Sequence, residues 1–471
     1  MTNRPSLPRP WWRCPGPLVA LGVHAVLFLG LYPLHFTDDE AERIDRRIEH
    51  RDRTREWVRS IVEEKGPWGL VIWFFNVHEE VRLYHRYAEV ALRGADPNQP
   101  ADDPRQGHFQ PYRDVPVEYP PGALAFIIPP ALFARDFEGY CLGFTLWMGI
   151  VYVAALGIAI AALGGSRPPP SDVNRALWWS VCFLLAFGGI VAARFDAAVA
   201  LVCAAGIWVY AKIDRPSAGP ACYAFLGFAA ACGVLVKIVP GALLPAVLLC
   251  LLFGAAGPRY RQALALLGGF LAGLAALNLL ACLRWGRGYL ESYRYHMARG
   301  TQVESTYSGF LIAAHGLGKP YSVDHGFGSF NLVTPYSSSV AAAWPWLFLA
   351  CSVLVAWRFW SVRGRGRSGP AAAGVLVVLF LLAFLLTNRV FSPQYMIWLG
   401  PLVAALCGFR VIPAWQGLVF LAATGLTQAI FPHLYGELLA LDPAMVLVLN
   451  LRNLTVLALF AVLLVKMPTH A

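Results

Sequence analysis

Charged side chains are scarce in this sequence. Of its 471 residues only 14% are charged, whereas 57% are hydrophobic and the mean hydropathy is +0.53. An average soluble domain has roughly 25% charged residues. A soluble fold of this length could not bury so much apolar surface, but a bilayer accepts apolar outward faces. The composition therefore excludes an ordinary soluble domain and predicts an all-α polytopic membrane protein.

Several short motifs are also missing. None of the 10 cysteines forms a CxxC pair or a Cys/His cluster with zinc spacing, so neither a zinc site nor a disulfide framework is predicted. There is no glycine-rich nucleotide loop, so a nucleotide-activated donor is not predicted. No ligand spacing demands a metal, and no cofactor is predicted, although a divalent-metal requirement stays open.

The net charge of +10 does not indicate a nucleic-acid partner, because the basic residues sit in breaks between apolar runs. Arginines cluster before the first run and in one later break, at Arg4, Arg9, Arg13, Arg358, Arg363, Arg365 and Arg367. The positive-inside pattern places both arginine clusters on the inner side of the membrane, together with Lys212, Arg259, Arg410 and Lys466. No cleavage site follows the run near 17–36, which is interpreted as a retained first helix.

Apolar runs organise the rest of the chain. They fall near 17–36, 122–134, 139–164, 175–192, 195–212, 221–236, 239–254, 262–283, 340–360, 371–388, 394–409, 412–430 and 444–466. Two inner termini need an even number of crossings, so we expect about twelve, with 122–134 as a partial helix. The predicted units are 1–36, an outer loop at 37–118 with amphipathic helices, helices over 119–283, a second outer loop at 284–339, and helices over 340–471.

Five polar clusters project to the same outer face in this topology. Polar groups at membrane helix ends cost energy, so such clusters are functional candidates. The candidate catalytic carboxylates are Glu80, Asp114 and Glu118. The candidate substrate-binding residues are Tyr84, Arg113, Tyr119, Arg194, Asp196, Lys237, His296, Arg299, Gln302, Glu304, Arg389 and Gln394.

Carboxylates beside cations suit transfer of a group from a phosphate to a hydroxyl. A base must take the hydroxyl proton, and Glu80, Asp114 or Glu118 could do so. The departing phosphate gains negative charge, which cations such as Arg299 or Arg389 could stabilise. Because a nucleotide loop is missing, the donor is expected to be borne on a lipid.

Each cluster also has a purely structural interpretation. Glu80 could pair with Arg82 or His85 on a surface helix, and Arg194 could pair with Asp196 across a helix break. Lys237 could extend to the interface. Arg299 and Glu304 could brace the long loop, and Gly269 and Gly273 form a GxxxG pair that indicates close helix packing.

The order of the motifs resembles a known family. The motifs are EVRLYHRYAEVALRG, PYRDVPVEYPPGALAF, RFD, KIVP, YHMARGTQVES, GFGSFNL and VFSPQYMIWLGP. Over residues 76–410 the chain resembles the bacterial membrane proteins grouped with polyprenyl-phosphate-mannose-dependent α-mannosyltransferases, which form glycosyltransferase family 87 and have the GT-C fold. EYPPG and SPQY are the more specific elements.

The resemblance implies inverting sugar transfer on the outer face of the cytoplasmic membrane. The donor would be a polyprenyl-phosphate sugar such as mannose, and the acceptor a glycolipid or glycan hydroxyl. A carboxylate of the first outer loop would act as base, and it falls at Glu80, where the family usually has Asp. Because Glu is one methylene longer than Asp, either the acceptor lies slightly further away, or Glu79 or Asp114 takes the role. The chain also departs from the family by an insert near 95–110 and by an additional segment at 37–75.

Two other classes remain as alternatives. A transporter or flippase of lipid-linked sugars would have a central polar path and inverted repeats, whereas the charges here gather on one face. A noncatalytic membrane scaffold would tolerate neutralisation of those charges, and an enzyme would not. The sequence is silent on oligomeric state.

Overall fold

The computed structural model describes residues 10–35, 53–75, 81–215, 217–254, 256–315, 322–362 and 369–467. Most of these residues are helical. The α-helices are α1 (Pro15–Val26), α3 (Arg53–Lys65), α4 (Pro67–Phe75), α5 (Arg82–Arg93), α6 (Leu124–Ala131), α7 (Phe137–Gly164), α8 (Pro170–Phe187), α9 (Ile190–Ala193), α10 (Ala197–Ile213), α11 (Pro220–Val236), α12 (Leu243–Phe253), α13 (Tyr260–Trp285), α14 (Glu291–Ala298), α15 (Thr306–His315), α16 (Ser337–Ser361), α17 (Pro370–Thr387), α18 (Gly400–Gly408), α19 (Ala414–Gln428), α20 (Tyr435–Leu439) and α21 (Pro443–Val465).

Short segments of other geometry connect these helices. The 3-10 turns are η1 (Trp11–Arg13), η4 (Pro121–Ala123), η5 (Val239–Ala242), η6 (Gly286–Leu290) and η7 (Pro393–Trp398). The π-helical turns are η2 (Leu27–Leu31) and η8 (Ala429–His433). The strands are β1 (Ser322–Gly326) and β2 (Ser329–Val333).

The predicted polytopic helical architecture is confirmed. Among the described residues, 6 helices are long and apolar enough to cross a membrane, at Phe137–Gly164, Tyr260–Ala298, Ser337–Ser361, Pro370–Thr387, Ala414–His433 and Pro443–Val465. Shorter apolar helices lie at Pro15–Leu31, Pro121–Ala131, Ala197–Ile213, Pro220–Val236 and Val239–Phe253. The total of about twelve crossings stays a prediction. Helix α6 has only 8 residues, or about 12 Å of rise, so it cannot span the bilayer, as expected for the 122–134 run.

Local chemistry determines where several helices begin. The Asp136 carboxylate accepts a hydrogen bond from the Gly139 amide at 2.8 Å at the start of α7. Asp442 accepts from the Ala444 amide at 2.9 Å at the start of α21. These carboxylates satisfy amides that have no partner within the helix. Proline occupies the first turn of α8, α11 and α17, where its missing N–H costs nothing.

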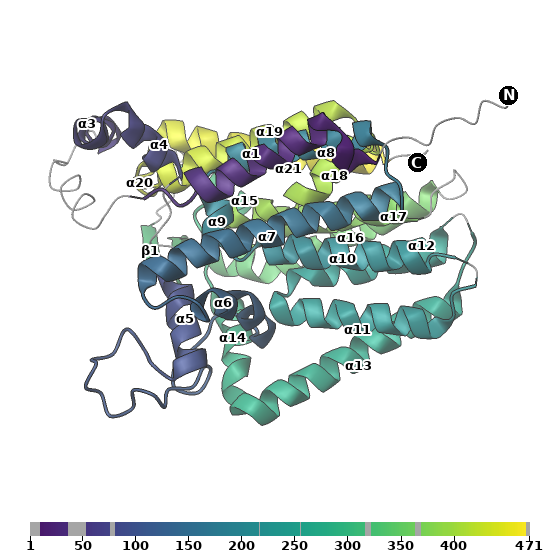
Figure 1. Ribbon diagram of the computed structural model, residues 1–471, viewed down its shortest axis with the longest axis horizontal. Helices are drawn as coiled ribbons and strands as arrows, with labels where there is room; N and C mark the ends of the chain where they lie inside the picture. Colours follow the sequence, from purple (N-terminus) through teal and green to yellow (C-terminus); the bar gives the residue numbers. More distant parts are fainter. Residues whose placement is uncertain are drawn as a thin grey trace.

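Helix α17 is the centre of the bundle and α16 lies at its edge. In α17, 14 of 18 residues are buried, whereas α16 buries only Val355 and Phe359 of its 25 residues. Figure 1 shows the long helices running side by side along the horizontal axis, with α5, α14 and β1 gathered at one end. The uncovered apolar surface of α16 is therefore the surface that lipid would contact.

Helices α11 and α13 cross very closely. A Cβ added to Gly269 would lie 2.0 Å from the Ala224 carbonyl oxygen, and one added to Gly227 would lie 2.0 Å from the Leu266 carbonyl oxygen. The GxxxG pair therefore packs as the sequence predicts, since only glycine permits this approach of two backbones.

We expect Gly269→Ala to separate α11 from α13 and to destabilise the protein by about 1–3 kcal/mol. The matched control is Gly268→Ala, because nothing lies within 4 Å of a Cβ at Gly268. Thermal unfolding in detergent measures both variants. Equal melting temperatures for the two variants would contradict the close crossing.

The hairpin β1–β2 is a feature that the all-α expectation missed. Its strands pair antiparallel, with Ser322 opposite Val333 and Gly326 opposite Ser329. The chain before α15 joins the outer edge of β2, where the Val303 amide donates to Phe330 O at 3.0 Å and the Leu332 amide to Thr301 O at 2.8 Å. This small sheet fixes the backbone of the second outer loop beside the helix ends.

Candidate functional site

A buried ion pair joins two of the predicted clusters. Asp196 lies in the break between α9 and α10, and Lys237 has extended backbone at the end of α11. The Lys237 ammonium lies 2.7 Å from Asp196 Oδ1, and the Trp398 indole N–H donates to the same oxygen. The sequence had suggested an Arg194–Asp196 pair, but the ion-pair partner of Asp196 is Lys237, which brings α11 and η7 together.

Four aromatic rings surround the Lys237 ammonium. Its nitrogen lies 5.8 Å from the ring centre of Tyr119, 5.1 Å from Phe195, 5.4 Å from Tyr395 and 5.3 Å from Trp398. The negative faces of aromatic rings attract a cation at such distances. Lys237 is therefore held in the interior by one carboxylate and the rings, and does not extend to the interface.

A polar cavity of about 370 Å³ opens beside this pair. We call it the polar cavity. Most of its lining residues come from the two outer loops and from the start of η7, and others come from the end of α9, from η8 and from α20. They are Leu83, Glu118, Tyr119, Arg194, Arg299, Gln302, Glu304, His325, Phe327, Gly328, Ser329, Phe330, Ser392, Pro393, Gln394, Phe431 and Tyr435. It holds seven of the predicted site residues. A cavity with several hydrogen-bonding groups suits a hydroxyl-rich ligand.

Glu118 is the first carboxylate of the polar cavity. Its Oε1 accepts a hydrogen bond from the Tyr295 hydroxyl at 2.8 Å. Burial raises the pKa of Glu118 above its usual value, and the Tyr295 bond and Arg299 oppose that rise. The motif EYPPG thus places a carboxylate against the second outer loop.

Glu304 is the second carboxylate, and it is 1% exposed. Its Oε2 accepts from the Gln302 amide at 2.8 Å, while Arg452 donates to the Glu304 main-chain oxygen. Burial raises the pKa of Glu304 to about 7, and the positive charge of Arg452 opposes that rise only in part. A carboxyl with this pKa can exchange a proton near neutrality.

A second cavity of about 420 Å³ lies on the side of α16. We call it the apolar cavity, because most of its wall is apolar. Its lining residues are Pro120, Lys237, Ile238, Val239, Tyr293, His296, Met297, Arg299, Ala341, Trp344, Pro345, Phe384, Asn388, Arg389, Val390, Tyr395 and Trp398. Three of them, Ala341, Trp344 and Pro345, belong to the lipid-facing helix α16.

Arg299 lines both cavities and stands at their junction. Arg389 lines the apolar cavity and donates to the main-chain oxygens of His296 and Met297. Within the described ranges neither arginine has an ion pair with a carboxylate. Positive charge without a paired carboxylate at this junction provides a place for an anion.

Other predicted residues have different positions. Asp114 is exposed, and its Oδ2 accepts from the Gln110 amide at 2.9 Å within a turn. Arg113 is also exposed, and neither residue lines the two cavities. Tyr84 is fully buried, and its hydroxyl accepts from Arg194 at 3.5 Å. Glu80, the base implied by the resemblance, lies outside the described residues.

Sequence reasoning overlooked two residues of this region. Arg452 is 0% exposed in α21, and its guanidinium carbon lies 3.9 Å from the ring centre of Phe391. Tyr435 of α20 lines the polar cavity. An arginine inside the last apolar run was a signal that could have found Arg452, because charged residues within membrane helices are rare. For Tyr435 the sequence contained no comparable signal.

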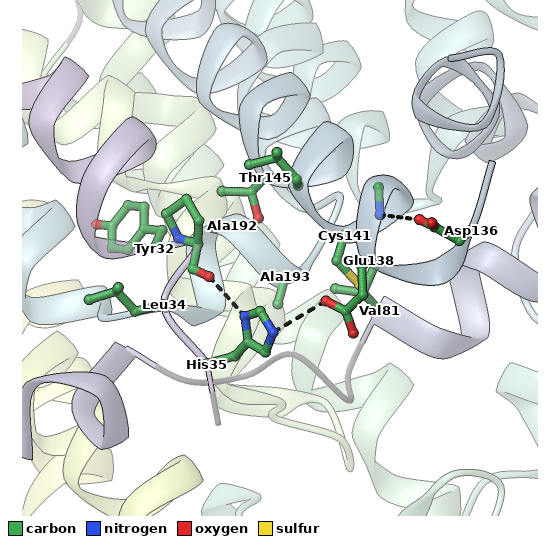
Figure 2. Close-up of a pocket in the computed structure, with 14 residues that line it drawn as sticks. Tyr32, Leu34, His35, Val81, Asp136, Glu138, Cys141, Thr145, Ala192 and Ala193 are labelled. Carbon is green, nitrogen blue, oxygen red and sulfur yellow. Dashed lines mark hydrogen bonds and ion pairs between the residues drawn. The ribbon is translucent and has the colours of Figure 1, made fainter. Parts of the chain in front are cut away.

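Another cavity, of about 480 Å³, lies elsewhere. Figure 2 shows His35 beside Glu138, and its Nε2 lies 3.2 Å from Glu138 Oε2. The Nδ1 of His35 lies 3.0 Å from the Pro33 main-chain oxygen. None of the predicted site residues that the structure describes lines this cavity. Among the described residues there is also no group of three side chains that could hold a metal ion. The candidate site is therefore the pair of cavities that meet at Arg299.

Comparisons with known proteins add little. No protein-family model matches the chain, and no curated protein matches it. Among solved structures, the crystal structure of ArnT from Cupriavidus metallidurans in the apo state aligns with 88% of this chain and 78% of that chain, at 16% identity and a TM-score of 0.41. A likeness of that TM-score is too low to support an argument about fold or function.

Proposed function

We propose that this chain is a membrane glycosyltransferase of the GT-C type. It moves a hexose such as mannose from a polyprenyl-phosphate donor to a hydroxyl of an envelope glycolipid or glycan, with inversion. The observation that carries the proposal is the meeting of two unlike cavities at Arg299. The apolar cavity borders the lipid-facing helix α16, so it suits the prenyl chain of a lipid-linked donor. The polar cavity contains two carboxylates, so it suits a hydroxyl acceptor.

The donor would enter from the bilayer along α16. Its prenyl chain would contact Trp344 and Phe384, which form part of the apolar wall. Its phosphate would lie at the junction, near Arg299 and Arg389. Charge-assisted hydrogen bonds from arginine to phosphate are strong and directional, and the charge on the phosphate grows as the sugar departs.

The sugar and the acceptor would occupy the polar cavity. There the acceptor oxygen attacks the anomeric carbon while the bond from that carbon to the phosphate oxygen breaks. A carboxylate takes the hydroxyl proton, and Glu118, Glu304 and the undescribed Glu80 are the candidates.

The proposed location is the inner cell membrane with the site on the outer face. Helix α10 runs from Asp196 at the site to Asp214, which pairs with Arg259 at 2.6 Å. Its 17 residues rise by about 25 Å, so Arg259 lies near the opposite end of the bundle. Arg358, whose Nε donates to Leu464 O near the end of α21, follows the same pattern. Basic residues gather on the cytoplasmic side of membrane proteins.

We expect the purified protein in liposomes to transfer sugar from at least one of a panel of polyprenyl-phosphate hexoses to an envelope glycolipid fraction. Glu118→Gln should lower the rate by about a hundredfold, because it removes a charge that contacts the sugar or the hydroxyl. Asp114→Asn should stay within about threefold of wild type, because Asp114 lies outside both cavities. Radiolabel incorporation measures each rate.

The control is Glu291→Gln, an exposed carboxylate that pairs with Arg294 at 2.6 Å. If the wild type moves lipid-linked sugar across the bilayer and transfers none, the flippase alternative is correct. If Asp114→Asn transfers no sugar while Glu118→Gln is active, the base lies in the PYRD turn. The proposal that the acceptor binds in the polar cavity would then be wrong.

A further inference from the structure

One buried carboxylate of the polar cavity has an oxygen with no hydrogen-bond partner. In the described part of the chain, Glu304 Oε1 has no hydrogen bond of acceptable geometry, although the Tyr435 hydroxyl lies near the carboxyl and Oε2 accepts from Gln302. Burying a charged oxygen without a donor is unfavourable, so such groups need an explanation. Glu304 lines the cavity that would hold the acceptor, and a ligand hydroxyl would supply the missing donor.

The backbone around Glu304 is held from both sides. Before it, the Gln302 amide donates to Arg389 O at 2.9 Å and the Val303 amide to Phe330 O at 3.0 Å. After it, the Ser305 hydroxyl lies 3.1 Å from that of Ser308 at the start of α15. A side chain placed by a sheet edge and a helix start keeps its position during a reaction.

Glu304 differs from Glu118 in the way its oxygens are used. Each carboxylate has one oxygen that accepts a side-chain hydrogen bond, Oε1 of Glu118 from Tyr295 and Oε2 of Glu304 from Gln302. Glu118 is only half-buried, so water can satisfy its other oxygen, whereas the other oxygen of Glu304 is buried. The nearest arginine to Glu304, Arg452, donates to its main-chain oxygen and so leaves the carboxylate free to titrate. A base needs an unoccupied lone pair and a pKa near the working pH.

We propose that Glu304 accepts the proton of the acceptor hydroxyl during sugar transfer, an assignment that rests on the proposed glycosyltransferase function. The acceptor oxygen forms its bond to the anomeric carbon, and the bond from that carbon to the phosphate breaks with its electron pair going to the phosphate. The hydroxyl proton goes to Glu304 Oε1. The base is thus in the second outer loop, whereas the resemblance places it in the first, at Glu80.

Several charged or titratable groups face Glu304 or share its cavity, and they affect its titration. Arg452 of α21 and Arg299 after α14 both lower the pKa of Glu304, and Tyr435 of α20 acts in the same direction. Glu118, Arg194 and His325 line the same cavity. The net effect of burial and these neighbours is a pKa of about 7 for Glu304, so the base form prevails only above that pH.

The test compares Glu304→Gln, Glu80→Gln and Glu118→Gln with wild type, with Glu291→Gln as the exposed control. Initial rates are measured from pH 5.5 to 8.5, with kcat and the donor KM determined separately. The wild-type rate should fall as the pH drops through about 7. In Glu304→Gln, kcat should fall by at least about a hundredfold, while the donor KM should stay within about threefold of wild type. The fall of the rate at low pH, which we call the acid limb of the pH profile, should disappear in this variant.

A second variant keeps the carboxylate and changes its surroundings. Arg452→Gln retains a donor for the Glu304 main-chain oxygen but removes the positive charge, so the acid limb should move to higher pH. The assignment of the base to Glu304 would be overturned if Glu304→Gln transferred sugar at a rate within tenfold of wild type. It would also be overturned if Arg452→Gln left the pH of the acid limb unchanged. Neither result would overturn the glycosyltransferase proposal. If Glu80→Gln removes the limb and Glu304→Gln does not, the base is Glu80. An inactive wild type overturns the glycosyltransferase proposal together with this assignment.

Discussion

Replacement of Arg299 by glutamine is expected to reduce sugar transfer by about a hundredfold to a thousandfold. Arg299 lines both cavities, and no carboxylate of the described residues forms an ion pair with it. The charge on the donor phosphate grows as the sugar leaves, and a fixed guanidinium at the junction stabilises that charge. Because this effect grows in the transition state, kcat should fall more than the donor KM rises.

The pH profile of Arg299→Gln gives a second readout. Arg299 lowers the pKa of Glu118 and also that of Glu304. Removing its charge should raise the pKa of both carboxyls, so the acid limb of the rate should move to higher pH in this variant. A residue that only braced the loop would change the rate without moving the limb.

The matched control for Arg299 is Arg294→Gln. Arg294 lies on the same helical segment but is exposed and pairs with Glu291 at 2.6 Å. Its loss should leave transfer near the wild-type rate. Arg299→Lys keeps the charge and loses the planar fork, so an intermediate rate is expected. If Arg299→Gln transferred sugar at the wild-type rate, the donor phosphate would not bind at Arg299 between the two cavities.

The sequence predicts the membrane class and the position of the site, because both depend on local signals. Apolar length and the interruption of helices by polar residues can be read along the chain. Lys237, Arg299 and Arg389 lie at or just after helix ends, Glu118 lies in the loop before η4, and all four line the cavities. Their motifs were found as breaks in apolar runs.

Pairing of distant residues could not be predicted in the same way. Arg194 and Asp196 are neighbours in sequence, but the structure pairs Asp196 with Lys237, 41 residues later. The helix breaks at Arg194, which has an extended backbone with φ −128°. Such choices depend on tertiary packing, which the sequence of one segment does not contain.

The roles within the PYRD and EYPPG motifs also depend on backbone geometry. Tyr112 has φ 66°, and its amide donates to Val115 O at 2.8 Å, so the chain turns sharply there. That turn leaves Asp114 exposed while Glu118 reaches the polar cavity. The hairpin at 322–333 was overlooked because each strand is only five residues long and contains polar residues, Ser322, Asp324 and His325 in β1 and Ser329 and Asn331 in β2.

The Asp196–Lys237 pair is expected to be the most costly single contact to break. Asp196→Ala would leave the ammonium of Lys237 buried without its carboxylate, with the aromatic rings as its remaining neighbours. Removing one partner of a buried pair costs about 3–5 kcal/mol, because a charge stays uncompensated in the interior. The melting temperature in detergent should fall strongly, and the yield of folded protein should fall with it.

A double variant separates the charge effect from the loss of packing. Asp196→Ala combined with Lys237→Met removes both charges and keeps an apolar side chain among the rings, so most of the stability should return. Glu291→Ala, which breaks the exposed Glu291–Arg294 pair, is the control and should leave the melting temperature nearly unchanged. A double variant as unstable as Asp196→Ala would show that the Trp398–Asp196 hydrogen bond, which both variants lose, stabilises this region instead of the ion pair. If the double variant is stable but inactive, the pair itself acts on the donor phosphate, and Lys237 belongs with Arg299 and Arg389 in binding it.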